Sequence, residues 1–125
     1  MNNKLVGTDG ESLAVSYIER IGYRIIDTNI RPFCGMRRGE IDIAAWDGDV
    51  LCIIEVKTRI SQRFDATEAI TVTKRRQLTR LARAYTDRHG LQSTECRFDV
   101  ICVYNSANEG APTIQLIKGA FDPVY

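Results

Sequence analysis

The sequence has a single histidine, His89, and this scarcity excludes several kinds of chemistry. Zinc hydrolases and Ser-His-Asp enzymes need histidine as a ligand or as a base, and one histidine at the end of a basic segment does not supply either site. The four cysteines show no CxxC spacing and no paired framework. Any metal ion bound by this chain would have to be held by oxygen ligands.

Long hydrophobic runs are also missing. No apolar stretch approaches the ~20 residues needed to span a bilayer, and no hydrophobic leader follows Met1. Cys52 and Cys102 lie within apolar runs and are expected to be small core residues. We therefore expect a cytoplasmic chain with reduced cysteines and no membrane contact. Its 125 residues suffice for one domain over 1–125, with residues 1–7 expected to form a flexible tail.

Charge of one sign is not in excess overall, but it is unevenly distributed. The formal net charge is +1, whereas residues 57–88 hold nine of the 17 cations and only three acids, which makes that segment +6. A basic segment on a neutral protein favours a local phosphate-facing surface. A solvated helix face would have the same composition, and charge alone does not separate the two interpretations.

Two amphipathic helices are predicted. The first begins at Thr8, where Thr8 and Glu11 have the spacing of a capping box, and ends at Gly22. Its apolar stripe consists of Leu13, Ala14, Tyr17, Ile18 and Ile21. The second covers residues 73–88 with a stripe of Leu78, Leu81, Ala82 and Tyr85, and its periodicity places Arg76, Arg80 and Arg83 on the opposite side.

Five strands complete an α/β fold with the order α-β-β-β-α-β-β. They are expected at residues 23–31, 40–46, 50–59, 96–104 and 113–121. The strands at 50–59 and 96–104 are apolar on both faces, as is typical of strands that are covered on both sides. We therefore predict a mixed central sheet with an antiparallel hairpin at its centre and helices on both faces.

The predicted hairpin, GEIDIAAWDGDVLCIIEVKTR at residues 39–59, carries the candidate chemistry. Strand alternation puts Glu40 and Asp42 on one face, with Ile41 and Ile43 on the other. A loop of residues 48–49 or 47–50 sets Asp42 opposite Glu55 and Glu40 opposite Lys57. A loop of residues 47–48 moves the partners by two but keeps the same face. Directly opposed side chains have Cβ atoms about 4.5–5.5 Å apart.

Carboxylates this close raise one another's pKa unless a cation lies between them. Mg²⁺ is the natural candidate, because it takes carboxylate oxygens and keeps several waters. Lys57 could then orient an attacking water or stabilise charge on a phosphoryl oxygen. The structural alternative is a network in which Lys57 bridges Glu40 or Glu55 and Asp42 caps a turn.

The sequence resembles the YraN-like family of the PD-(D/E)xK nuclease superfamily, which is similar to archaeal Holliday-junction resolvases and has the restriction-endonuclease-like fold. The resemblance spans Glu11 to Phe121, and a usual proline before the aspartate is replaced here by Ile41. It rests on Gly10-Glu11, Gly22-Tyr23, Asn29 with Arg31, Gly39-Glu40-Ile41-Asp42, Glu55-Val56-Lys57-Thr58-Arg59 and Arg97-Phe98-Asp99.

The resemblance implies an αβββαβ core and specific roles for four residues. Asp42 and Glu55 would be metal ligands, and Lys57 would be the catalytic lysine. Glu11 occupies the place of a further acidic ligand, although the capping box with Thr8 explains it equally well. Asp99 is most simply a partner for a nearby arginine.

The first functional hypothesis is a Mg²⁺- or Mn²⁺-dependent nuclease that acts on DNA, with branched or damaged DNA and a homodimer implied by the resemblance to resolvases. The second is a non-catalytic nucleic-acid-binding module that retains the nuclease fold, and the third is an interaction protein without a nucleic-acid role. Phosphate contacts are expected from Arg37, Arg38, Arg59, Arg63, Lys74, Arg75, Arg76, Arg80 and Arg83.

Overall fold

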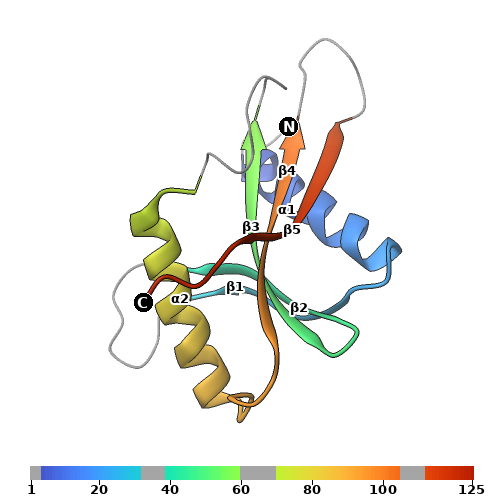
Figure 1. Cartoon of the computed structure of the whole chain (residues 1–125). Coiled ribbons are helices and arrows are strands. Elements are labelled where there is room, and N and C mark those ends of the chain that lie inside the picture. Colours follow the sequence, from blue (N-terminus) through green and yellow to red (C-terminus); the bar gives the residue numbers. More distant parts are fainter. Residues whose placement is uncertain (1–3, 32–38, 60–69, 105–111) are drawn as a thin grey trace.

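The residues that the structure describes form two helices and five strands in the predicted order (Figure 1). A computed structural model describes residues 4–31, 39–59, 70–104 and 112–125. The elements are α1 (Lys4–Arg20), β1 (Arg24–Ile30), β2 (Ile41–Asp47), β3 (Val50–Arg59), α2 (Val72–Arg88), β4 (Cys96–Tyr104) and β5 (Thr113–Phe121). The α/β class is thereby confirmed, and the last three predicted strand ranges agree with the structure at both ends.

The five strands form one mixed sheet in the order β1-β2-β3-β4-β5. The pair β3–β4 is parallel, and the other three pairs are antiparallel. The β2–β3 hairpin therefore supplies the middle strand of the sheet, as predicted. The parallel pair requires a crossover between β3 and β4, and α2 lies within that crossover.

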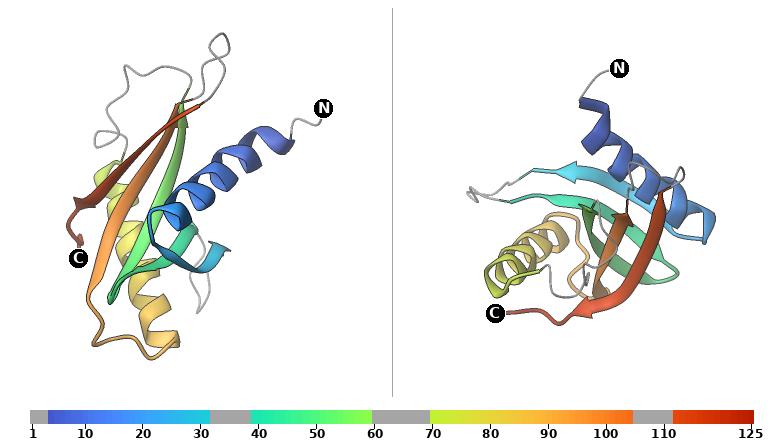
Figure 2. Two further views of the ribbon diagram at one scale, coloured as in Figure 1. Left: turned by 90° about the vertical axis from the view of Figure 1, so that its right-hand side faces the viewer. Right: turned by 90° about the horizontal axis from the view of Figure 1, so that it is seen from above.

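One helix covers each face of the sheet (Figure 2). Ala14 and Ile18 of α1 pack with Cys52 and Ile54 of β3 in a core cluster that we call the α1 cluster. On the other side, Leu51 and Ile53 pack with the predicted apolar stripe of α2, which is buried throughout, in what we call the α2 cluster. Successive residues of β3 thus point to opposite helices, which explains why this strand is apolar on both faces.

Both ends of α1 differ from the prediction. The helix begins at Lys4, so Lys4–Gly7 are not part of a tail, and Thr8 lies inside the helix rather than at its N-terminus. At the other end the helix stops at Arg20 and the chain turns at Gly22, which has φ of 109°. Ile21 is therefore exposed rather than part of the core stripe. Neither described helix has the length and apolar composition required to cross a membrane.

Candidate active site

The register of the β2–β3 hairpin places Asp42 beside Glu55. The strands are paired from Asp47↔Val50 to Ile43↔Ile54, so residues 48–49 form the loop, and Asp42 and Glu55 are the next residues outward. A loop of residues 48–49 is one of the predicted loops that set Asp42 opposite Glu55. The local pattern of the hairpin was sufficient to bring the two carboxylates together.

The two strands separate at Asp42. Regular pairing between β2 and β3 ends at Ile43 and Ile54. Beyond that pair, the Val56 N–H donates a 2.8 Å hydrogen bond to Asp42 Oδ2. The carboxylate therefore takes the position that a main-chain acceptor would have in a continued ladder. The predicted alternation fails here, because Ile41 packs in the α2 cluster whereas Ile43 packs in the α1 cluster. Glu40 precedes β2 and does not pair with Lys57 across the hairpin as predicted.

Asp42 and Glu55 form a buried carboxyl pair. Their side chains are 8% and 6% exposed, respectively. Burial raises the pKa of Asp42 to about 7, and the hydrogen bond and charge of Glu55 act in the same direction. The Val56 N–H and the charge of Lys74 partly oppose this rise. Without a bound cation, the pair therefore favours holding a proton near neutral pH.

Glu11 approaches the pair from α1. The residue before it, Gly10, lies so close to Thr58 of β3 that a Cβ at this position would collide with the threonine hydroxyl. Only glycine lets the helix come this near to the strand. This close approach carries Glu11 toward the gap between β2 and β3.

The pKa of Glu11 reflects the neighbouring acids. Burial raises the pKa of Glu11, and the charges of Asp42 and Glu40 add to the increase. A hydrogen bond from Asn29 partly offsets this effect. Asn29 has φ of 51°, the only positive φ among the described non-glycine residues, and strained backbone of this kind is common at functional sites. Glu11 therefore belongs to the acidic group, and the capping explanation is wrong because the helix starts earlier.

Glu55 forms an ion pair with Lys74 of α2, which the sequence did not predict. The Lys74 Nζ lies 3.4 Å from Glu55 Oε2. The first turns of α2 also pack against the start of the hairpin, where the Gln77 side chain fills the space that a Cβ of Gly39 would occupy. Gly39 has φ of 83°, which further favours glycine there. We call Glu11, Asp42, Glu55 and Lys74 the carboxylate cluster.

Two buried oxygens in the carboxylate cluster lack hydrogen-bond partners, namely Glu11 Oε1 and Glu55 Oε2. The ammonium of Lys74 is close enough to Oε2 for an ion pair but is not aligned for a hydrogen bond. Buried carboxylate oxygens without donors are costly, and they are ligands that suit a hard divalent cation. Within the described ranges, however, no three acidic, histidine or cysteine side chains converge into a ready-made metal cage.

Lys57 extends the same face of β3 as Glu55. Its partner across the parallel β3–β4 pair is Cys102, which packs in the α2 cluster. Lys57 is half-buried, and it has no ion pair with any residue in the part of the chain that the structure describes. The ion pair expected of Lys57 in the structural alternative is thus formed by Lys74 instead.

The predicted phosphate-contacting residues differ in their surroundings. Arg76, Arg80 and Arg83 are exposed along α2, as its periodicity predicted. Arg75 is engaged within the fold, because its Nε donates to the Ile70 carbonyl at 3.0 Å and its guanidinium lies over the Phe121 ring. Arg59 donates to the carbonyl of Thr58. Three further residues predicted to contact phosphates lie outside the described residues, namely Arg37, Arg38 and Arg63.

A second polar group, which we call the arginine network, consists of Tyr23, Asp47, Arg97 and Asp99. Arg97 binds Asp99 through Nε and Nη2 at 2.8 and 2.9 Å, and its Nη2 also donates to Tyr23 and Asp47. Tyr23 Oη and the Gly119 N–H complete the partners of the fully buried Asp99. The hydrogen bond from Arg97 lowers the pKa of Asp47. The expectation that Asp99 pairs with an arginine is confirmed.

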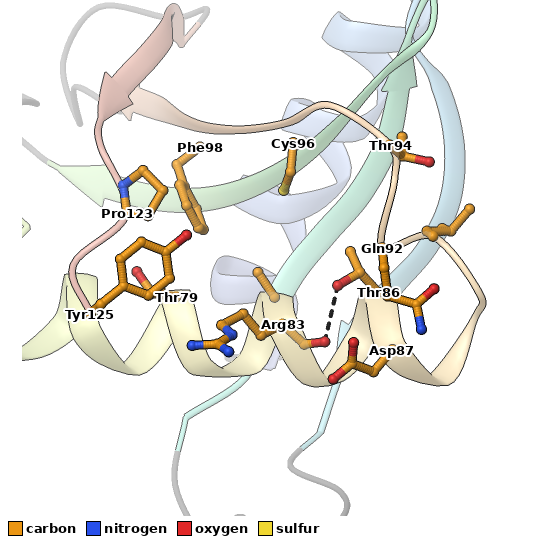
Figure 3. A pocket seen from close by; sticks show the side chains of 12 residues that line it. Thr79, Arg83, Thr86, Asp87, Gln92, Thr94, Cys96, Phe98, Pro123 and Tyr125 are labelled. Carbon is orange, nitrogen blue, oxygen red and sulfur yellow. Dashed lines mark hydrogen bonds between the residues drawn. The ribbon is translucent and has the colours of Figure 1, made fainter.

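A pocket of about 420 Å³ lies apart from the carboxylate cluster, between α2, the start of β4 and the C-terminal residues. Figure 3 shows Arg83 and Thr86 projecting from α2, opposite Phe98 and Tyr125. The Thr86 hydroxyl donates to the Arg83 carbonyl at 3.0 Å, and the Arg83 guanidinium lies 5.4 Å from the centre of the Tyr125 ring. None of the predicted catalytic residues lines this pocket.

Comparison with known proteins gives a consistent set of relatives. Residues 10–103 match the model of a family described as uncharacterised protein family UPF0102. A UPF0102 protein of Geobacter sulfurreducens is 42% identical over 125 residues, covering 99% of this chain and 94% of the relative. A UPF0102 protein of Caldicellulosiruptor saccharolyticus is 39% identical over 122 residues, covering 97% and 100%. One from Symbiobacterium thermophilum is 42% identical over 120 residues, covering 95% and 98%.

Proposed function

The chain belongs to the UPF0102 family, and from the carboxylate cluster we propose that it is a nuclease of the PD-(D/E)xK type that hydrolyses phosphodiester bonds in DNA with Mg²⁺ or Mn²⁺. The observation that carries this proposal is the pair of buried carboxylate oxygens on Glu11 and Glu55 that have no hydrogen-bond donor. A fold that needed these acids only for packing would satisfy them or replace them.

The chain's own residues would divide the work as follows. Asp42, Glu55 and Glu11 would hold the divalent cation, which when bound supplies charge stabilisation for the phosphodiester and a more acidic water. The Val56 N–H fixes Asp42 through Oδ2. Lys57 would donate hydrogen bonds from Nζ to the attacking water or to a phosphoryl oxygen. The exposed arginines of α2 would hold the DNA backbone without reading its sequence.

A non-catalytic nucleic-acid-binding module is the second candidate. The observation that favours it is that Lys74 already neutralises Glu55 in the absence of any metal and that the acids do not form a finished cage. In this case α2 would still bind phosphates, and the affinity would still fall steeply with salt. The two candidates differ in whether the wild-type protein cleaves DNA in a reaction that depends on Asp42.

The test is a cleavage panel of linear, nicked, flapped and four-way DNA and matched RNA, with Mg²⁺ and with Mn²⁺. Asp42→Asn keeps an acceptor for Val56 and should lower the rate about 100-fold or more while binding is retained. The control is Asp49→Asn, which makes the same charge change in the exposed hairpin loop and should leave the rate within about twofold. Equal cleavage by wild type and Asp42→Asn would point to a contaminating nuclease, and binding without cleavage would support the second candidate.

A further inference from the structure

The carboxylate cluster already holds one cation that the chain itself supplies. Lys74 Nζ lies 3.4 Å from Glu55 Oε2, and Lys74 is 30% exposed whereas Glu55 is 6% exposed. The positive charge of Lys74 also opposes the rise in the pKa of Asp42. Both members of the buried carboxyl pair therefore interact with this one ammonium.

The main chain around Lys74 is held firmly at the start of α2. Thr71 is the N-cap, and its hydroxyl accepts the Lys74 N–H at 3.1 Å. The neighbouring Arg75 donates from Nε to the Ile70 carbonyl. These contacts fix the origin of the Lys74 side chain, while its ammonium has no aligned hydrogen bond to Glu55. The contact is therefore ionic only and can be exchanged without the loss of a directional bond.

Resting on the proposed function, we propose that Lys74 is an internal counterion that competes with the divalent cation for Glu55. In the cation-free protein the ammonium offsets the repulsion between Asp42 and Glu55. A divalent cation held by Glu55 would compete with the Lys74 ammonium, because two cations at one carboxylate repel each other. The site then takes a divalent cation more weakly than its carboxylates alone would, and it stays folded when the cation is absent.

The experiment measures Mn²⁺ binding by titration calorimetry on the full chain at low salt and pH 7.5. Lys74→Met keeps most of the aliphatic stem and removes the charge, so it should bind Mn²⁺ about five- to tenfold more tightly than wild type. Arg76→Met is the matched control, since it removes one positive charge from an exposed position of the same helix. Screening by solvent should keep its affinity within about twofold of wild type.

Thermal unfolding supplies a second readout. Without Mn²⁺, Lys74→Met should unfold at a lower temperature than wild type, and saturating Mn²⁺ should raise its Tm by more than it raises that of wild type. Lys74→Gln serves if the methionine variant does not fold. Unchanged or weaker Mn²⁺ binding by the Lys74 variants, or equal tightening by Arg76→Met, would overturn the competition while leaving the proposed nuclease site intact. Absence of Mn²⁺ binding by wild type at millimolar concentration would overturn the metal site and the competition together.

Discussion

Two groups of buried charge lie beside β3, and they are built in opposite ways. In the arginine network, Asp99 is fully buried and each of its carboxylate oxygens receives two hydrogen bonds. In the carboxylate cluster, Glu55 is nearly as buried, yet Oε2 has an ion pair without a hydrogen bond, and Glu11 Oε1 has no partner among the described residues. One group is complete within the chain, and the other lacks donors.

The difference indicates which group serves the fold and which is available for chemistry. A fully satisfied polar network rigidifies a core, whereas a partly satisfied one costs stability. Natural proteins accept that cost mainly at functional sites. The arginine network joins the turn after α1 to β2 and β4, so its residues connect segments far apart in the sequence. The four predictions below test whether the two groups differ in this way.

The largest expected effect is on stability, in the arginine network. Asp99→Asn should lower the free energy of unfolding by about 3–5 kcal/mol, the range for breaking a buried ion pair. Each carboxylate oxygen of Asp99 accepts two hydrogen bonds. The NH₂ group of an asparagine side chain would replace one of these oxygens in either orientation and would place its N–H groups against those donors. Urea denaturation at 25 °C measures the change. A loss below about 1 kcal/mol would mean that the network is not structural.

The second effect concerns pH and has opposite signs in the two groups. The folded-state pKa of Asp42 is raised to about 7 from an ordinary value of 3.8. The folded protein therefore binds more protons between these values, and the stabilisation, about 4 kcal/mol, is present below pH 4 and is lost as the pH rises through 7. Asp47 has a lowered pKa, so its contribution to the free energy of unfolding is present above pH 3.8. That contribution is lost as the pH falls through the folded-state pKa, which lies below 3.8.

The measurement is urea unfolding from pH 4.5 to 8 for wild type and Asp42→Asn in the absence of divalent cations. The difference in the free energy of unfolding between the two proteins should change steadily over this range and level off above about pH 8. A constant difference would show that Asp42 titrates normally in the folded protein and that the buried carboxyl pair holds no extra proton.

Removing an acid from the carboxylate cluster should not destabilise the protein. Glu55→Gln is expected to raise the free energy of unfolding by about 1 kcal/mol at pH 7.5, because it removes repulsion between two buried carboxylates. Lys74 is 30% exposed and can reach water when its partner becomes neutral. The same variant should lose cleavage activity. Denaturation at pH 7.5 provides the test, and a loss of more than about 2 kcal/mol would make the Lys74–Glu55 pair a structural bond.

Local sequence patterns were enough to predict the core of the candidate site. The hairpin signal at Asp47-Gly48-Asp49 and the period of two along β3 placed Asp42 beside Glu55. The same alternation failed at Ile41, because the side chain of Asp42 replaces a main-chain acceptor and the strands separate. A period of two holds only while a strand remains paired, and nothing in the residue types marks where pairing stops.

The rest of the site depends on helix docking, which local patterns do not encode. Lys74 is predicted to contact phosphates, and in the structure it also pairs with Glu55, because the start of α2 lies beside β3 at that level. For Glu11 the sequence left a helix cap and a metal ligand equally open. The helix starts at Lys4, which removes the cap, and the close approach at Gly10 brings Glu11 toward the other acids. A signal for this docking was present: Gly10 directly precedes Glu11, and Gly39 stands at the start of the hairpin segment that carries Asp42.

The smallest expected effect compares the lysines of the two groups. Lys118 lies 3.3 Å from Asp47 at the edge of the arginine network, and its Nζ lies 5.5 Å from the centre of the Tyr23 ring. Lys118 is 52% exposed, so solvent screens both contacts, and Lys118→Met should change the free energy of unfolding by less than about 1 kcal/mol. Because Arg97 still holds Asp47 at 2.9 Å, the network stays complete without this lysine. Urea denaturation of Lys118→Met beside cation-free Lys74→Met measures the contrast. If both variants lost stability equally, exposure would not distinguish the two lysines, and the Lys74–Glu55 contact would be an ordinary surface pair rather than the counterion of a buried site.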